Sequence, residues 1–147
     1  MGNRAIITGT EDKSLGVYLH WNGGIESVYN FIQYAKLKGV RTFNEDAGYC
    51  TARLCQIIGN FFKGTLSVGV VTDCEDKTTD NDRYEIGDNW EIFHIKDGKV
   101  IVNAKPELDD IGDEISVEEW NESFMKEINK NMPDKVSGEA IKGAICK

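Results

Sequence analysis

The stretch Tyr18-Leu19-His20-Trp21-Asn22-Gly23-Gly24 joins an alternating apolar segment to the start of a helical pattern, and the rest of the chain is organised around it. Two adjacent glycines let the backbone adopt positive φ and let other groups approach closely. A strand that ends in this way at a helix start directs free N–H groups outward, which suits an anion such as phosphate. A tight turn with a packed Trp21 and a capping Asn22 explains the same residues, so spacing alone leaves both interpretations open.

The residues on both sides of this joint predict a hairpin and then a helix. Residues 3–10 and 15–21 have β-like apolar patterns with a polar turn between them, which is typical of two antiparallel strands. Apolar residues at helical spacing follow Gly24 directly. We expect Asn22 or Gly23 to cap this helix.

A second helix and two strands follow. The helix begins near Asn44 or Glu45, with acidic residues in its first turn, and Gly64 is the expected stop. Its apolar stripe consists of Ala47, Cys50, Leu54, Ile57, Ile58 and Phe61. The apolar run at 65–72 predicts a buried strand, and 83–86 predicts a short one.

The last third of the chain predicts a hairpin, an acidic connector and a helical pair. Residues 89–96 and 99–104 form the hairpin, which turns at Asp97-Gly98. After the connector, Ser116 and Glu119 have the spacing of a capping box at the start of a helix. A short last helix ends the chain.

Hairpin-connected strands and paired helices predict an α+β fold rather than a parallel α/β sheet. We expect an antiparallel sheet built from hairpins, two central helices and a C-terminal helical pair. The length fits a single domain, with an α/β core over residues 1–105 and an acidic helical segment over residues 106–147.

The net charge of −8 is concentrated in one segment. Residues 106–134 hold ten acidic and two basic residues, so the remaining 15 acidic and 15 basic residues balance. Helices with this charge can pack on a neighbouring subunit instead of closing a single core. An acidic chain with four arginines is a poor candidate for binding DNA or RNA polymers, but a pocket for a small anion needs only one or two cations.

Metal and cofactor chemistry is not indicated. The cysteines Cys50, Cys55, Cys74 and Cys146 form no C-x-x-C pair and are remote in sequence from both histidines, which argues against zinc. The acidic run at 73–88 lacks the spacing of an EF-hand. No long apolar segment or signal peptide is present, so we expect a cytoplasmic protein with reduced thiols, no membrane contact and no cofactor.

Catalysis is not supported by spacing either. His20 and His94 are the only histidines, and no nucleophile-elbow or cysteine-protease pattern surrounds any serine or cysteine. His94 lies in an alternating strand, where we interpret it as a structural residue.

A nucleotide-like ligand fits the side chains found where elements end. Flat apolar faces suit a base, amides suit sugar edges, and cations or N–H groups suit phosphates. Arg53 lies at the edge of the second helix's apolar stripe and can present its guanidinium to a cleft, although a surface ion pair is an equal alternative. Phe61 is better explained as core, which leaves Phe62 as the stacking candidate. The predicted ligand-binding residues are Trp21, Asn22, Gly23, Arg53, Asn60, Phe62 and Trp90.

Three segments resemble a known family. These are Gly2-Asn3-Arg4-Ala5-Ile6-Ile7, Val17-Tyr18-Leu19-His20-Trp21-Asn22-Gly23-Gly24 and Ala52-Arg53-Leu54-Cys55-Gln56-Ile57-Ile58-Gly59-Asn60-Phe61-Phe62. They are similar to the first type of phage Thoeris anti-defence protein. The resemblance covers roughly residues 2–72 and extends more loosely to the acidic loop and the Trp90 strand. It does not extend to the acidic C-terminal helices.

The resemblance implies a sponge, which binds a cyclic ADP-ribose-type immune signal in the host cytoplasm during infection without cleaving it. It also implies cyclic oligonucleotides as ligands of some members, and a dimer-based homo-oligomer, up to a hexamer, with pockets at subunit junctions. Two alternatives stay open. One is an enzyme that degrades the same signal, with His20 or a Glu or Cys of the second helix as acid or base. The other is an inhibitor that binds a host defence protein through its acidic C-terminal helices.

Overall fold

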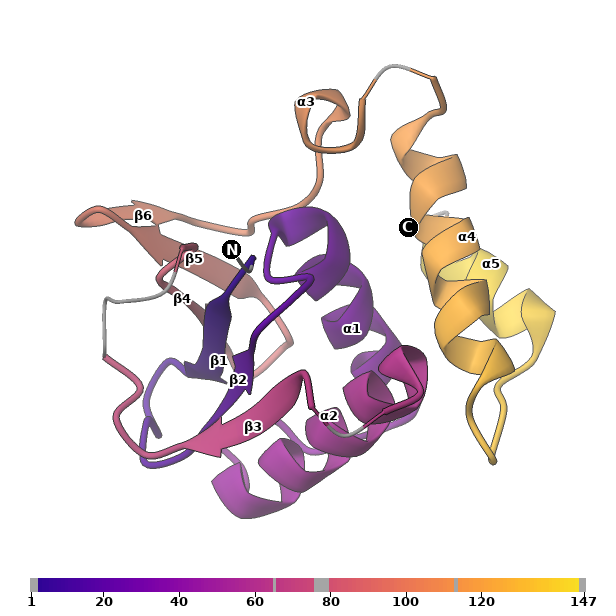
Figure 1. Ribbon diagram of the computed structural model, residues 1–147. Helices are drawn as coiled ribbons and strands as arrows, with labels where there is room; N and C mark the ends of the chain where they lie inside the picture. The colour runs from indigo at the N-terminus through magenta and orange to yellow at the C-terminus, as the bar shows by residue number, and fades with distance from the viewer. Residues whose placement is uncertain (1–2, 65, 76–79, 113, 146–147) are drawn as a thin grey trace.

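The computed structural model describes residues 3–64, 66–75, 80–112 and 114–145, and this part of the chain forms a six-stranded sheet with helices packed on one side (Figure 1). Thr65, Cys146 and part of the acidic run at 73–88 lie outside the described residues. The strands are β1 (Ala5–Gly9), β2 (Gly16–Leu19), β3 (Val68–Val71), β4 (Arg83–Ile86), β5 (Ile92–Lys96) and β6 (Lys99–Ile101). The helices are α1 (Ile25–Leu37), α2 (Ala47–Phe62), α3 (Leu108–Ile111), α4 (Val117–Lys130) and α5 (Gly138–Ile145).

The strands follow the order β3-β2-β1-β4-β5-β6. Every neighbouring pair is antiparallel except β1 and β4, which run parallel. The predicted α+β class is therefore confirmed. The predicted hairpins β1–β2 and β5–β6 are present, and Asp97 and Gly98 both adopt the positive φ that a two-residue hairpin turn requires.

Helices α1 and α2 lie against the sheet, and α4 and α5 form an outer layer on them (Figure 1). Apolar side chains from β1, β2 and β4 meet those of α1 and α2 in one continuous core. The stripe predicted for α2 contributes Cys50, Leu54 and Ile58, all fully buried. No helix in the described part of the chain is long and apolar enough to span a bilayer.

The acidic helix α4 covers its apolar side within its own chain. Met125 and Ile128 of α4 are fully buried in the same core. Polar contacts add to this packing, because the Trp120 indole donates to the Glu26 carbonyl at 2.9 Å and the Tyr34 hydroxyl donates to Asn129 at 2.7 Å. The segment after residue 106 is part of the folded body.

The strand expected to be buried at 65–72 was misplaced. Among the described residues of this range, Val68–Val71 is strand, and it forms one edge of the sheet, where Val70 is 58% exposed. Leu66, before it, is 94% exposed. An apolar run looks the same in a central strand and in an edge strand, because neighbours in the sheet are set by tertiary pairing.

Helix ends explain most of the remaining differences. Helix α2 begins at Ala47, and its cap is Asp46, whose carboxylate accepts from the Tyr49 amide at 3.1 Å, so the acids precede the first turn instead of lying in it. The capping box of Ser116 and Glu119 is confirmed. The acidic connector contains α3, a single turn with its own capping box.

Candidate functional site

The seven residues predicted from the sequence lie in three regions. They are the β2–α1 joint for Trp21, Asn22 and Gly23, the β4–β5 connection for Trp90, and α2 for Arg53, Asn60 and Phe62. Of the seven, Arg53 and Asn60 on α2 line surface clefts that could hold an anion.

Gly23 is a structural residue of the joint. Its amide donates to the Asn3 carbonyl at 2.7 Å, and its carbonyl accepts from the buried Tyr84 hydroxyl at 2.7 Å. A Cβ at this position would lie 2.5 Å from the Asn3 oxygen, so only glycine fits. Because both backbone groups have partners, Gly23 has no N–H left for an anion.

Asn22 also serves the fold. It adopts a left-handed conformation with φ of 60°, which asparagine tolerates, and its amide donates to the Ser27 hydroxyl at 3.1 Å. The cap of α1 is Gly24, so the expectation that Asn22 or Gly23 caps this helix was wrong. Trp21 is 44% exposed, with its ring edge-on to His20 at 4.8 Å, so it is not the packed residue that a tight turn would place there.

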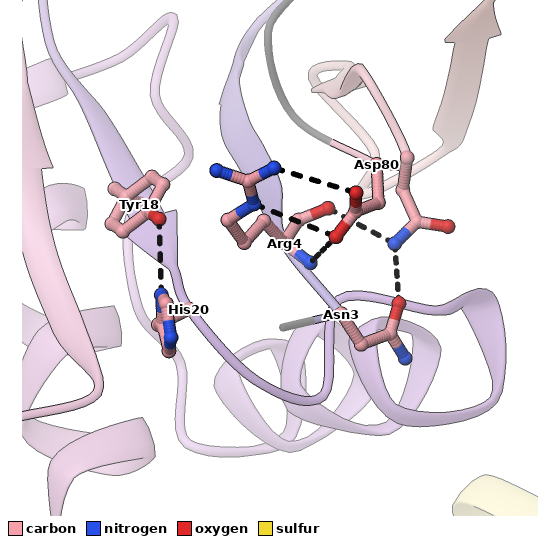
Figure 2. Close-up of polar contacts among 6 residues, drawn as sticks. Asn3, Arg4, Tyr18, His20 and Asp80 are labelled. Atoms are coloured by element: carbon pink, nitrogen blue, oxygen red, sulfur yellow. Dashed lines mark hydrogen bonds and ion pairs between the residues drawn. The ribbon is translucent and has the colours of Figure 1, made fainter. Parts of the chain in front are cut away.

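Further polar contacts join residues at the end of the sheet where the β2–α1 joint lies (Figure 2). Arg4 pairs with Asp80 at 3.5 Å, and Asp80 also accepts from the Arg4 amide, which lowers the pKa of the carboxyl. The Asn81 amide donates to Asn3 at 2.6 Å and to the Arg4 carbonyl at 3.0 Å. These bonds tie the start of β1 to the segment before β4.

The first turn of α1 is occupied by a carboxylate of its own chain. A Cβ on Gly24 would collide with the Glu26 carboxylate, which folds back over the helix start. Partial burial raises the pKa of Glu26, and Asp110 raises it further. A phosphate at this helix terminus would have to displace Glu26, so the N–H groups of α1 do not offer a free anion site.

A cleft of about 780 Å³ opens beside this helix start, between it, β5, β6 and α3; we call it the sheet-end cleft. Its ionic lining consists of Glu26, Glu107, Asp109, Asp110, Lys96 and Lys105. Its volume would hold a small ligand, but carboxylates outnumber ammonium groups, which disfavours an anion.

Trp90 and Phe62 pack against the protein. Trp90 is 9% exposed and belongs to the core, in a turn where its own φ is 65°. Phe62 is partly buried, and its ring lies 5.5 Å from Phe61 and 6.4 Å from Phe31. Neither ring is displayed for stacking on a base.

The two cysteines of α2 and His94 lie at least partly inside the protein. Cys50 is buried, which raises the pKa of its thiol to about 12, and burial raises the pKa of Cys55 as well. His94 stacks on Tyr84 at 4.2 Å, donates to the Asn81 carbonyl at 2.9 Å, and has a pKa lowered by burial. The described residues contain no group of three or more side chains suited to a metal ion.

Arg53 lies at the centre of a different site. Its guanidinium carbon lies 4.7 Å from the centre of the Tyr49 ring, and that of Arg41 lies 5.3 Å from the same ring. Arg41 pairs with Asp46 at 3.6 Å, whereas Arg53 forms no ion pair with a described residue. The ring therefore holds the Arg53 guanidinium in place while its N–H groups remain free to donate.

Two clefts meet along this face of α2. One of about 170 Å³ is lined by Tyr49, Arg53 and Gln56, and the other, of about 540 Å³, by Gln56, Asn60 and Lys63. We call the two together the α2 groove. Four of the α2 residues that line it, Tyr49, Arg53, Gln56 and Asn60, are spaced three or four residues apart and so lie on one side of the helix, and the C-cap Lys63 continues this row.

The turn after α4 forms the opposite wall. Asn131 lines the larger cleft, and Met132 and Asp134 line the smaller one. The Asn60 amide lies 3.5 Å from the Met132 sulfur, which joins the two walls. Asp134 pairs with Lys38 at 2.8 Å, and this contact lowers the pKa of its carboxyl.

The charge balance of the α2 groove favours an anion. Lys38, Arg53 and Lys63 line it, and Asp134 is its one described carboxylate. The rise of an α-helix places Arg53 and Lys63 about 15 Å apart, so two cations bracket the amides of Gln56 and Asn60. This arrangement can hold an extended molecule with more than one anionic group.

Sequence reasoning found Arg53 and Asn60 but missed Tyr49, Gln56 and Lys63. Their spacing of three or four residues along α2 was available from the sequence, but it lies on the polar side of a helix interpreted by its apolar stripe. The wall from residues 131–134 could not be inferred, because it depends on how α4 packs on α2.

No protein-family model matches the chain, and comparisons with curated proteins and with solved structures find no match.

Proposed function

We propose that this protein is a phage anti-defence sponge that binds a cyclic ADP-ribose-type signalling nucleotide and holds it without cleaving it. The observation that carries the proposal is the Arg53 guanidinium, which is fixed on Tyr49, free of ion pairs with described residues and set in a cation-rich groove. The resemblance of residues 52–62 to the first type of Thoeris anti-defence protein supports the same ligand class.

The groove supplies the contacts that such a ligand needs. Arg53 donates to a phosphate, and its exposed plane can also stack on a base. Lys63 adds to the positive potential of the groove, and the amides of Gln56 and Asn60 donate to and accept from sugar or base edges. Cyclic oligonucleotides present the same phosphates and edges and form the second ligand class.

The larger cleft of the groove is open to solvent and the smaller one holds only about 170 Å³, whereas tight retention needs a site that encloses the ligand. The resemblance implies a dimer-based homo-oligomer, up to a hexamer, with ligands at subunit junctions. A second subunit placed over α2 would close the groove. The host cytoplasm is the compartment in which such a signal is met, and it keeps the thiols reduced.

The proposal is tested by asking whether the protein retains the nucleotide and releases it chemically unchanged. The purified protein is incubated with a cyclic ADP-ribose isomer, freed of unbound ligand, and heat-denatured before chromatography of the released material. The expected product is the intact cyclic molecule, in an amount that falls strongly for Arg53→Ala. Linear ADP-ribose in the released fraction would replace the sponge with an enzyme, and an empty fraction would refute nucleotide binding.

A second function has one observation in its favour. The outer face of α4 exposes the carboxylates of Glu118, Glu119 and Glu127, a surface that a basic region of a host defence protein could bind. Deleting the C-terminal segment is a poor test, because Met125 and Ile128 belong to the core. Replacing the three glutamates by glutamine keeps the fold, and an unchanged anti-defence phenotype would exclude this alternative.

A further inference from the structure

Gly59 occupies a position in helix α2 where the fold itself does not require glycine. It lies four residues before the C-cap Lys63 and lines the larger cleft of the α2 groove. Its φ is outside the left-handed region, and a Cβ built on it would meet no described atom within 4 Å apart from its own stretch of the helix. Glycine destabilises a helix interior relative to alanine, because it loses more backbone freedom on folding. The free protein would therefore be more stable with alanine at this position.

Lys63 departs from helix preferences in the opposite direction, and it lines the same cleft. It ends α2 in the left-handed conformation, with φ of 59° and ψ of 31°, for which helix ends usually use glycine. The other described non-glycine residues with positive φ are four Asn or Asp residues, which tolerate it, and Trp90, which is packed in the core. Lys63 is exposed, so packing does not account for its conformation. The cleft thus lacks a side chain where the helix favours one and holds a cation where the helix favours none.

Three carboxamides line the cleft beside Gly59 and retain hydrogen-bonding capacity. They belong to Gln56, Asn60 and Asn131. Gln56 forms no hydrogen bond with another described residue, and Asn60 has only a weak contact with a sulfur atom at 3.5 Å. Asn131 donates to a carbonyl of α4 at 3.3 Å, which leaves its own oxygen free to accept. A carboxamide offers a donor next to an acceptor, and this pattern complements the amino group and N7 of adenine.

We propose that this cleft holds the adenine base of the nucleotide, with the ring lying flat over Gly59 and its edge bonded to the carboxamides. The inference rests on the function proposed above and assigns each part of the ligand to a place in the groove. The cleft of about 170 Å³ beside Arg53 holds a phosphate, and the cleft of about 540 Å³ at Gly59 holds the larger base. A planar ring can approach the helix backbone closely only where no Cβ projects, and glycine meets that condition.

The positions of the polar groups suit this placement of the base. Gln56 and Asn60 are four residues apart, so their carboxamides lie on one side of α2 and can meet the same base edge. Lys63 follows at the C-terminal end of the helix, where the free carbonyl groups carry partial negative charge. Its ammonium offsets that charge, which would otherwise repel an anionic nucleotide from this end of the groove.

Gly59→Ala tests the placement, because stability and binding should change in opposite directions. Alanine fits the open space and favours the helix, so the thermal midpoint should rise by about 2–4 °C. The new methyl group occupies the surface on which the base lies, so affinity should fall about ten-fold. Isothermal titration measures the affinity with a cyclic ADP-ribose isomer whose ring closes between the two riboses, which leaves the adenine edge free.

Gly48→Ala is the matched control on the same helix. Gly48 is an exposed residue of α2 that lines neither cleft of the groove, and a Cβ there would have Asp46 Oδ1, at 3.9 Å, as its nearest neighbour. The substitution should raise the thermal midpoint by a similar amount and leave affinity within about two-fold of wild type.

The hypoxanthine analogue of the same ligand tests the base contact. Hypoxanthine replaces the amino donor of adenine by an oxygen acceptor, so the native protein should bind the analogue about ten-fold more weakly. Replacing Gln56 and Asn60 together by alanine should reduce this preference to about two-fold, because the groups that distinguish the two bases are then absent.

The outcomes separate the placement of the base from the proposed function. Failure of the native protein to bind either ligand would refute both. Binding by the native protein that Gly59→Ala leaves unchanged, or that Gly48→Ala weakens equally, would overturn the placement alone. A lower thermal midpoint for Gly59→Ala with unchanged affinity would make this glycine a requirement of the fold, and equal affinity of the native protein for the two bases would likewise overturn the placement.

Discussion

The α2 groove and the sheet-end cleft carry opposite balances of charge. The groove sets Lys38, Arg53 and Lys63 against Asp134, whereas the sheet-end cleft sets Lys96 and Lys105 against four carboxylates. The sheet-end cleft, at about 780 Å³, is larger than either part of the groove. Volume alone would select the sheet-end cleft as the site of an anion, and electrostatics selects the groove.

The two regions also differ in how their polar groups are used. At the sheet end, Gly23, Asn22 and Asn81 have their hydrogen bonds satisfied within the chain, and Glu26 covers the start of α1. On α2, the guanidinium of Arg53 is oriented but unpaired among the described residues. A binding site is recognised by donors that are held in position and left free, not by the number of polar residues.

Loss of Arg53 should have the largest effect that separates the two regions. Arg53→Ala removes a charge-assisted contact to the ligand, which should weaken binding by about 1.5–3 kcal/mol, roughly ten- to a hundred-fold. Isothermal titration with a cyclic ADP-ribose isomer measures the change. Because Arg53 is exposed and outside the core, thermal unfolding should be unaffected.

Lys96→Ala in the sheet-end cleft is the matched control for that measurement. Lys96 is also an exposed, unpaired cation in the described part of the chain, but it faces the carboxylate-rich cleft. Its loss should leave affinity within about two-fold of wild type. If Lys96→Ala weakens binding and Arg53→Ala does not, the two clefts have been assigned the wrong way round.

Gly23→Ala should act on stability and not on the groove. The new Cβ would lie 2.5 Å from the Asn3 carbonyl and 2.8 Å from Arg4, so the joint must shift, at a cost of about 1–3 kcal/mol. Urea unfolding measures this cost. The folded fraction should bind nucleotide with wild-type affinity, and a specific loss of affinity at unchanged stability would return the joint to the candidate binding residues.

Tyr84→Phe should have a smaller effect at the same joint. It removes the hydroxyl that donates to the Gly23 carbonyl at 2.7 Å while keeping the ring that stacks on His94. The expected loss is about 1 kcal/mol in the free energy of unfolding. A double-mutant cycle with Gly23→Ala should be non-additive, because both changes affect one contact, and strict additivity would show that the hydroxyl acts elsewhere.

Most helices and strands could be predicted, because the signals that define them, such as turn residues and helix caps, lie within short stretches of sequence. The Asp97-Gly98 turn and the Ser116 capping box were both identified correctly. What could not be predicted was set by contacts between distant segments. The edge position of Val68–Val71, the burial of Met125 and the wall opposite Arg53 all depend on tertiary pairing or packing.

The predicted site residues also divide into those set by local sequence and those set by contacts between distant segments. Arg53 was identified because its position at the edge of an apolar stripe is a local property, and the structure places it in a cleft as that position predicts. Gly23 and Asn22 were singled out as an unusual local sequence, but the partners that occupy their polar groups are Asn3, Tyr84 and Ser27. Unusual sequence at a joint therefore marked structural constraint as readily as ligand contact.

The smallest expected effect concerns Glu26 and the pH dependence of stability. Because burial raises its pKa in the folded state above the ordinary value of 4.5, the folded protein binds this proton more tightly than the unfolded chain does. The stability that the protonated Glu26 carboxyl contributes is fully present when the pH is below its pKa in the unfolded chain. This contribution is lost as the pH rises through its pKa in the folded protein. Glu26→Gln keeps the shape of the side chain and removes the charge.

The variant should therefore gain stability relative to wild type as pH rises from about 4 to about 7, by less than about 1 kcal/mol because the group is half exposed. Denaturant unfolding of both proteins across this range measures the difference. Asp110→Asn, which removes a charge that raises the pKa of Glu26, should reduce the pH trend without abolishing it. A difference that shrinks with pH would mean that the Glu26 carboxylate stabilises the start of α1 more than its burial costs, and the sheet end would then contain a favourable anion site already filled by its own chain.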